Sequence, residues 1–258
     1  MNNMKVSIIT VVFNNVSTIK NAIDSVLGQT YQNIEYIVID GASTDGTVDV
    51  VTRYQDKISV FISESDKGIY DALNKGIELA TGDVIAILHS DDIYCNEFVV
   101  SDMVGKMTSS NAEFCFSDMV VINCQLDKVL RYYRANYFSR WMFRIGWMPP
   151  HPTCFIKKSL FDEFGMYSTD YKIAGDFDLL LRFFYGRKIR WSYLDQITIK
   201  MSAGGVSNSG WQSKRLIFNE ISRSLKSNGI WSLSIFQLIR YIIRMLEIMI
   251  KPKKISCD

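Results

Sequence analysis

The sequence predicts an α/β protein with a mostly parallel central sheet, flanked by helices and followed by a C-terminal helical extension. Segments with the period of a strand alternate with segments with the period of a helix through the first hundred residues. Acidic residues follow directly after several of these segments. Strands and helices that alternate in this way form right-handed βαβ units, whose strands run parallel.

In the first part of the chain, each expected strand is a run of β-branched and aliphatic residues that ends in polar residues. These strands are expected at 6–13, 35–39, 58–62 and 84–88. The segments between them carry apolar residues on one helical face. The corresponding helices are expected at 16–27, 47–54 and 69–80.

The rest of the chain is less regular. A strand is expected at 113–122, and an aromatic-rich segment, YFSRWMFRIGWMPPHP, follows it. The next expected elements are helices at 159–164 and 176–186 and a strand at 189–199. A segment rich in Gly, Ser and Asn then follows at 202–210, a composition typical of a loop.

Length and composition exclude several classes of protein. With 258 residues, 48% of them hydrophobic, the chain can bury one large core, or one core with a smaller lobe. A formal charge of +2 is too slight to indicate a nucleic acid as partner. The five cysteines show no C-x-x-C spacing, which favours reduced thiols in a cytoplasmic compartment over disulfides or a zinc site. No signal peptide is expected at the N-terminus.

Three acidic clusters indicate an enzyme. They contain Asp40, the pair Asp91 and Asp92, and Asp176 with Asp178. The first two follow expected strands, where an open α/β sheet presents its ligand crevice. A carboxylate in that position contributes little to a core, but it is well placed to hold a ribose, a metal ion or a reacting hydroxyl.

Adjacent carboxylates such as Asp91 and Asp92 repel one another unless a cation neutralises them. A divalent cation would do so and would leave coordination positions open for the oxygens of a diphosphate. The alternative is that the pair caps a helix beginning near Glu97.

Asp40 and Asp176 each allow a structural and a functional interpretation. Asp40 caps the following turn or binds a nucleobase and ribose, and Asp45 is better placed to cap the helix at 47–54. Asp178 serves the first turn of its helix. That assignment leaves Asp176 free to act as a general base in a crevice.

The order of five motifs resembles that of the family-two inverting glycosyltransferases of the GT-A fold, of the bacterial surface-polysaccharide or O-antigen type. The motifs are SIITVVFNN, VIDGASTDGT, DKGIYDALNKGIELATGD, HSDD and AGDFDLLLR. The resemblance covers roughly residues 4–210. It implies a catalytic domain at 1–210, with a nucleotide-binding half at about 4–95 and an acceptor half at about 96–210, followed by C-terminal helices at 211–258.

The resemblance also implies roles for individual residues. Phe13 and Asp40 would bind the nucleotide base, and Asp91 would lie near the ribose and the donor sugar. Asp92 would ligate Mn²⁺ or Mg²⁺ on the diphosphate, with Lys67 assisting the departure of that diphosphate.

Asp176 corresponds to the family's catalytic base. The sequence departs from the family pattern beside it, because Gly175 replaces the glutamate of the usual Glu-Asp pair. It departs again after the second strand, where Asp-Gly replaces the Asp-Asp that is common in the family. Nucleotide binding at this point would then depend more on Asp40 alone.

The function implied is the inverting transfer of a hexose from a UDP-sugar to a lipid-linked saccharide, carried on undecaprenyl diphosphate, with formation of a β-glycosidic bond. Such a reaction would serve the synthesis of O-antigen or capsule. A sugar nucleotidyltransferase is an alternative, but it needs a glycine-rich loop after the first strand, and VVFNN contains no glycine. A non-catalytic membrane-surface binding protein is another, if Gly175 reflects a decayed site.

The C-terminal segment at 232–251 is apolar apart from a stripe of polar residues three or four apart. The stripe consists of Gln237, Arg240, Arg244, Glu247 and Lys251. These charges argue against a membrane-spanning helix, which needs about 20 mostly uncharged residues. An interfacial helix, with the basic tail KPKK at anionic headgroups, fits better and predicts a cytoplasmic protein peripheral to the inner face of the inner membrane. The alternative is a helix packed on the catalytic core or on a second subunit.

Two histidines and one loop complete the candidates. His151 is expected to be a hydrogen-bonded structural residue rather than a metal ligand or an acceptor contact, and His89 is expected to pack in the core. The segment at 204–208 resembles the family's loop near the active site; a surface linker is the alternative.

Overall fold

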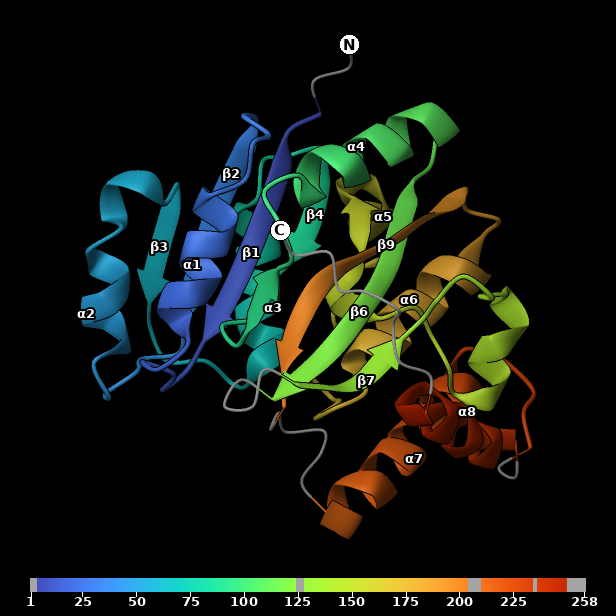
Figure 1. Ribbon diagram of the computed structural model, residues 1–258. Helices are drawn as coiled ribbons and strands as arrows, with labels where there is room; N and C mark the ends of the chain where they lie inside the picture. Colours follow the sequence, from blue (N-terminus) through green and yellow to red (C-terminus); the bar gives the residue numbers. More distant parts are fainter. Residues whose placement is uncertain (1–3, 124–127, 204–209, 234–235, 250–258) are drawn as a thin grey trace.

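The computed structural model describes residues 4–123, 128–203, 210–233 and 236–249 (Figure 1). The loop at 204–208 and the basic tail at 251–254 lie outside this part of the chain. A twisted sheet runs through the molecule, and its strands follow the order β3-β2-β1-β4-β8-β6-β9-β5, with β7 paired to β6. The strands are β1 (Val6–Val12), β2 (Ile34–Asp40), β3 (Val60–Ser63), β4 (Val84–Ile87), β5 (Asp92–Tyr94), β6 (Phe114–Asn123), β7 (Lys128–Tyr133), β8 (Phe155–Lys157) and β9 (Trp191–Ser202).

Helices cover both faces of this sheet (Figure 1). The α-helices are α1 (Ile19–Leu27), α2 (Thr47–Thr52), α3 (Ile69–Leu79), α4 (Val99–Ser110), α5 (Lys158–Phe164), α6 (Gly175–Gly186), α7 (Gly210–Ser227) and α8 (Gln237–Met249). Short 3₁₀ helices are η1 (Gln55–Lys57), η2 (Arg140–Ile145) and η3 (His151–Thr153).

The sheet consists of a parallel part and a mixed part. Strands β1 to β4 pair in parallel, as the alternating pattern predicts. Strand β8 is antiparallel to both β4 and β6, β5 is antiparallel to β9, and β7 is antiparallel to β6. The α/β class is therefore confirmed, and the sheet is mixed rather than mostly parallel because antiparallel strands join its two halves.

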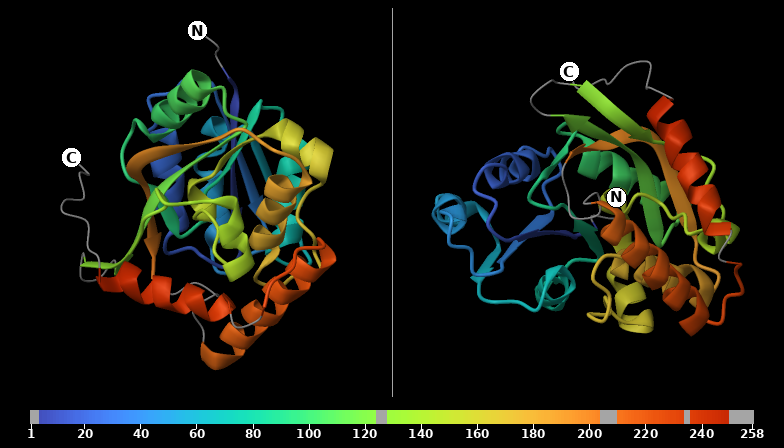
Figure 2. Two further views of the ribbon diagram at one scale, coloured as in Figure 1. Left: turned by 90° about the vertical axis from the view of Figure 1, so that its right-hand side faces the viewer. Right: turned by 90° about the horizontal axis from the view of Figure 1, so that it is seen from below.

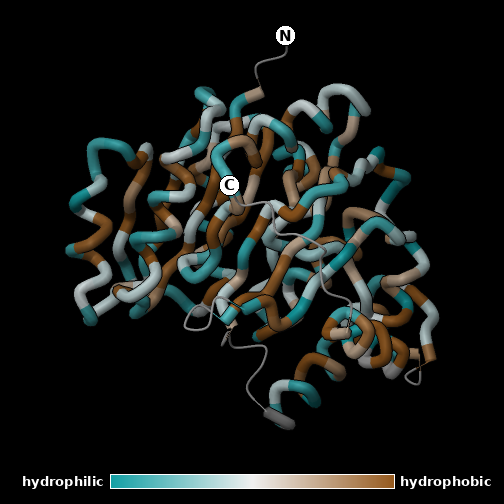
Figure 3. The backbone as a smooth tube through the Cα atoms, viewed as in Figure 1, coloured by the Kyte–Doolittle hydropathy of each residue, from teal (hydrophilic) through white to brown (hydrophobic). Residues whose placement is uncertain are grey.

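Alternate residues of the central strands enter two separate cores. Ile9 and Ile37 face the side of α3 and α6, whereas Ile8 and Val38 face the side of α1 and α4. Side chains of a strand point alternately to opposite faces, so a strand covered on both sides is apolar throughout. Figure 3 shows hydrophobic residues along the central strands and on the helices that cover them.

The last two helices lie together at one end of the molecule, where α7 packs on α6 and α8 packs on β7 and η2 (Figure 2). Within the described ranges, no helix is both long and apolar enough to cross a bilayer.

Candidate active site

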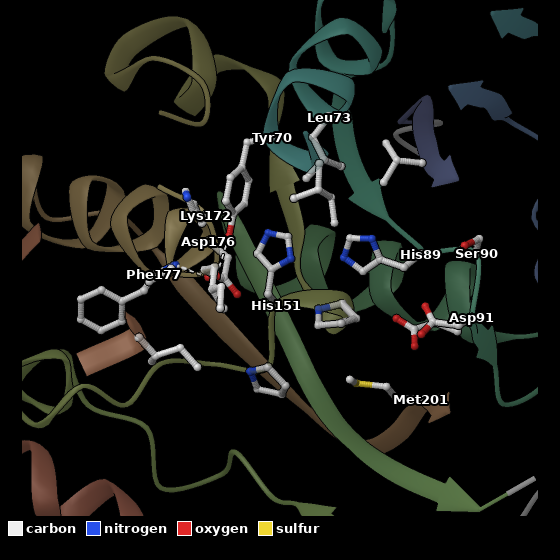
Figure 4. A pocket seen from close by; sticks show the side chains of 18 of the residues that line it. Tyr70, Leu73, His89, Ser90, Asp91, His151, Lys172, Asp176, Phe177 and Met201 are labelled. Carbon is white, nitrogen blue, oxygen red and sulfur yellow. Dashed lines mark hydrogen bonds between the residues drawn. The ribbon is translucent and has the colours of Figure 1, made fainter. Parts of the chain in front are cut away.

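A cavity of about 660 Å³ opens where the two halves of the sheet meet. Its walls include Phe13, Asp91, Asp92 and Asp176, so it brings together four of the six candidate residues. The other two, Asp40 and Lys67, are not part of its wall. Figure 4 shows Asp176 on one side of the cavity and Asp91 on the other.

Asp176 lies in the first turn of α6 and faces the cavity. Its Oδ1 accepts a hydrogen bond of 2.8 Å from the Phe177 amide. Burial, with a smaller contribution from the charge of Glu220, raises the pKa of Asp176 to about 6. A carboxyl with a pKa in this range is well suited to accept a proton near neutral pH.

The segment that precedes Asp176 is held by Glu220 of α7. Glu220 Oε1 accepts a hydrogen bond from the Lys172 amide at 2.8 Å. Its Oε2 accepts one from Ile173 at 3.0 Å and one from Ala174 at 2.8 Å. Ala174 is the N-cap of α6, so these three amides belong to the N-cap residue and the two residues before it, and a carboxylate from another helix satisfies them. The sequence carried no signal for this contact.

Tyr70 of α3 holds the same segment from the other side. Its hydroxyl donates a hydrogen bond to the Ile173 carbonyl at 2.6 Å and accepts one from the Gly175 amide at 2.9 Å. The Tyr70 ring also stacks on Tyr167, with 5.6 Å between the ring centroids. Tyr70 and Glu220 together define the position from which Asp176 enters the cavity.

Asp92 is the first residue of β5 and is only 1% exposed. Burial raises its pKa well above the usual value, with a further contribution from the charge of Asp91. Its Oδ1 has no hydrogen-bond partner among the described residues. Asp91 and Asp92 do not cap α4, whose N-cap is Phe98. The Phe98 amide donates its hydrogen bond to Asn96 Oδ1 instead, at 2.9 Å.

The acidic pair suits a divalent cation. An unpartnered carboxylate oxygen beside a second carboxylate is a hard-oxygen donor set of the kind that Mn²⁺ and Mg²⁺ bind. The described residues contain no group of three or more His, Cys, Asp or Glu side chains suited to a metal. Oxygens of a diphosphate and water would therefore have to supply the remaining ligands.

Asp40 is the last residue of β2. It is fully buried and lies opposite Val12 of β1 in the sheet. Its Oδ2 accepts hydrogen bonds from the Ser43 amide at 2.9 Å and the Ser63 hydroxyl at 2.7 Å. Its Oδ1 has no partner in the part of the chain that is described. Asp45 does contact the start of α2, since it accepts a hydrogen bond from the Thr47 amide at 3.0 Å. Asp40 thus fixes a turn with one oxygen, and its other oxygen is buried.

Phe13 and Lys67 lie at the surface. Phe13 follows β1 and exposes 63% of its area at the mouth of the cavity. Lys67 is exposed, and its backbone amide donates to Asp71 Oδ2 at 3.0 Å.

Both histidines line the cavity and lie between Asp176 and Asp91 (Figure 4). His151 Nε2 is 2.6 Å from the Tyr167 hydroxyl, so it has the hydrogen bond expected of a structural residue. Burial, together with the nearby His89, lowers the pKa of His151 to about 3. Burial also lowers the pKa of His89. His89 was expected only to pack in the core, but its position makes both neutral imidazoles part of the site.

Comparison with known proteins assigns the chain to a family. The sequence model described as Glycosyl transferase family 2 matches residues 7–171. The chain belongs to glycosyl transferase family 2. An uncharacterised glycosyltransferase of Mycobacterium tuberculosis is 36% identical over 184 residues, which are 69% of this chain and 68% of that protein.

Two solved structures share the fold of this family-2 chain. S. aureus TarS 1–349 in complex with UDP-GlcNAc has a TM-score of 0.68 and 18% identity, over 86% of this chain and 66% of that one. The mannosyltransferase PcManGT from Pyrobaculum calidifontis, in complex with GDP-Man and Mn²⁺, has a TM-score of 0.63 and 19% identity, over 94% and 70%. The observed architecture is thus that of a GT-A glycosyltransferase.

Proposed function

We propose that this family-2 chain is an inverting hexosyltransferase, which moves a hexose from a UDP-sugar to a saccharide acceptor and forms a β-glycosidic bond. One observation carries the proposal: Asp176 and Asp91 line a single cavity from opposite sides, and Asp92 is part of the wall of the same cavity. Inversion needs a base on one face of the sugar and a bound leaving group on the other. A cavity with this arrangement supplies both.

In this proposal the Asp176 carboxylate takes the proton of the acceptor hydroxyl while the new bond to the anomeric carbon forms. A positioned base of this kind contributes roughly 10²–10⁴-fold in rate. Glu220 and Tyr70 hold the backbone on either side of the base, so that it meets the acceptor in one orientation.

The donor would lie along the carboxyl ends of β1, β2 and β4. Phe13 would contact the base, the free Oδ1 of Asp40 would accept a hydrogen bond from it, and Asp91 would lie near the ribose. Asp92 would hold Mn²⁺ or Mg²⁺, which would supply charge stabilisation for the departing diphosphate. Mn²⁺ in the PcManGT complex and a nucleotide sugar in both structural neighbours support this arrangement. Lys67 is close enough in sequence to Asp66, which lines the cavity, to assist as the diphosphate leaves.

The proposed acceptor is a saccharide carried on undecaprenyl diphosphate at the inner face of the inner membrane, in the synthesis of O-antigen or capsule. The outer face of α8 supports a membrane location, because its apolar side chains are exposed. They are Ile239, Ile242, Met245, Leu246, Ile248 and Met249. An amphipathic helix of this kind binds at a membrane interface. The division into a catalytic domain at 1–210 and membrane-associating helices at 211–258 belongs to the same proposal, with α7 also supplying Glu220 to the site.

A donor screen tests the proposed activity. UDP release would be measured with Mn²⁺, a lipid-linked saccharide as acceptor, and UDP-glucose, UDP-galactose or their N-acetyl forms as donor. The anomeric configuration of the product would be read by NMR. We expect turnover with at least one donor and a β-linked product. An α-linked product would contradict inversion, and the absence of UDP release from every donor would contradict the donor assignment. The sugar nucleotidyltransferase alternative would instead release pyrophosphate when it is given UTP and a sugar 1-phosphate.

A further inference from the structure

The cavity that contains Asp176 has a basic end, which no role proposed above uses. Arg131 of β7 and Arg240 and Arg244 of α8 all line it. A spacing of four residues places Arg240 and Arg244 on one face of α8. Arginine is the side chain best suited to bind a phosphate, because its planar guanidinium donates two parallel hydrogen bonds.

A row of paired residues connects this basic end with the acidic pair. Asp92 of β5 pairs with Met201 of β9. Met201 pairs with Val121 of β6, which in turn pairs with Arg131 of β7. Three steps between neighbouring strands therefore separate Asp92 from Arg131, or roughly 14 Å between their backbones.

The guanidinium of Arg131 is held on the side of α8. Its Nε lies 3.2 Å from Glu247 Oε2, and its Cζ lies 4.9 Å from the centre of the Tyr133 ring. An anion bound there is consequently distinct from a diphosphate bound beside Asp92.

Positive charges gather at this end of the cavity. Glu247 lies within ion-pair distance of Arg131, and its charge also acts on Arg244. Burial lowers the pKa of Arg244, and the positive charges of Arg131 and Arg240 lower it further. Cations that repel one another in a partly buried site are stabilised by a bound anion.

The opposite face of α8 indicates what kind of molecule carries this anion. Ile242, Met245 and Met249 are 59%, 66% and 76% exposed, and they follow one another at helical spacing. The same helix thus directs cations into the cavity and apolar side chains to the outside. An amphiphile with an anionic head and an apolar tail matches both faces.

We infer that Arg131, Arg240 and Arg244 form an anion subsite that binds the diphosphate of a lipid-linked acceptor and holds its sugar between Asp92 and Asp176. This inference rests on the proposed function for the direction of transfer, but binding of the diphosphate itself can be measured without a donor. A free phosphate would bring the same chemistry without the apolar tail.

Calorimetry with geranyl diphosphate tests the subsite. The titration is done in EDTA, so that no cation draws the diphosphate to Asp91 and Asp92. Geraniol and inorganic pyrophosphate are titrated in parallel. We expect geranyl diphosphate to bind, geraniol to bind at least about tenfold more weakly because it lacks the charge-assisted hydrogen bonds, and pyrophosphate to bind more weakly than the lipid.

Single substitutions then identify the residues. Arg240→Gln and Arg244→Gln should each weaken geranyl diphosphate roughly tenfold, the range expected for one lost charge-assisted hydrogen bond. Arg240→Lys keeps the charge and should retain part of the affinity. Arg215→Gln is the matched control, because Arg215 is an exposed arginine of α7 outside the cavity wall, and it should bind like the wild type. Thermal melting of each variant checks that it is folded.

Three outcomes would overturn the subsite: geraniol binding as tightly as geranyl diphosphate, folded Arg240 and Arg244 variants with wild-type affinity, or no binding by the wild type. Pyrophosphate binding as tightly as the lipid would overturn the lipid-linked acceptor in favour of a free phosphate. Binding of UDP with Mn²⁺ is measured separately. Its failure would count against the proposed function and would leave the subsite result intact.

Discussion

The Tyr70 hydroxyl accepts a hydrogen bond from the Gly175 amide at 2.9 Å, and the Tyr70 ring occupies the space that a side chain at position 175 would need. A Cβ atom built on Gly175 would lie 2.6 Å from Tyr70 Cζ. Glycine beside the candidate base is therefore explained by the packing of Tyr70. This relationship removes the reason for regarding the site as decayed.

Gly175→Ala should destabilise the protein, because the new methyl group collides with a buried aromatic ring. Overpacking of this kind costs about 1–3 kcal/mol, which denaturant unfolding would measure. The double variant Gly175→Ala with Tyr70→Ala should lose less stability than the sum of the two single changes, since Tyr70→Ala removes the ring with which the new methyl group collides. Additive losses would mean that the two residues do not compete for this space.

Glu220→Gln should weaken the support of the segment before Asp176. The glutamine cannot accept hydrogen bonds with both terminal atoms, so at least one of the amides of Lys172, Ile173 and Ala174 loses its partner, at a cost of about 1–3 kcal/mol. Removing the Glu220 charge should also lower the pKa of Asp176, because that charge raises it. The acidic limb of the kcat/KM profile would then move to lower pH. A loss of stability with an unmoved limb would show that Glu220 acts on the fold alone.

Asp176→Asn should abolish transfer and leave UDP-sugar binding intact, because the amide has no carboxylate to accept the proton. The expected loss is about 10²–10⁴-fold in kcat. In the wild type, activity should rise with pH through about 6, since Asp176 acts as a base only when it is deprotonated and burial sets its pKa at about 6. Near-normal turnover of the variant would assign the base to another residue.

Asp92→Ala should abolish the dependence of donor binding on metal. Asp92 has the unpartnered buried oxygen, and its removal leaves Asp91 as the remaining carboxylate of the pair. Calorimetry of UDP with Mn²⁺ and with EDTA measures the effect: the wild type should bind more tightly with Mn²⁺, and the variant should bind equally weakly in both. Asp56→Ala, an exposed aspartate of η1, is a suitable control. Retained Mn²⁺ dependence in the Asp92 variant would exclude it as a ligand.

The features that could be predicted from the sequence are those that depend on a local pattern of residues. The strands of the first half are long apolar runs, and their ends carry Asp40, Asp91 and Asp92, so both the strands and these residues were found. Strands β5 and β8 have three residues each, which is too short for a period to be seen, and with β7 they add the antiparallel pairs that make the sheet mixed. Tyr70 lies 105 positions from Gly175 in the chain, and Glu220 lies 46 positions from Ala174, although each contacts the amide of that residue. Contacts of that kind depend on how α3 and α7 pack, and no local pattern records them.

Ile242→Glu and Met245→Glu should weaken binding to lipid vesicles, because both side chains lie on the exposed face of α8 and a charge there opposes insertion among acyl chains. Flotation with phosphatidylglycerol vesicles measures the bound fraction, and the double variant should lose most of it. Leu79→Glu places the same charge on an exposed leucine of α3, away from α8, and should float like the wild type. If the α8 double variant and the Leu79 variant float equally well, α8 does not bind the membrane, and its apolar face would instead cover a protein surface. In that case the double variant should change the oligomeric state measured by light scattering.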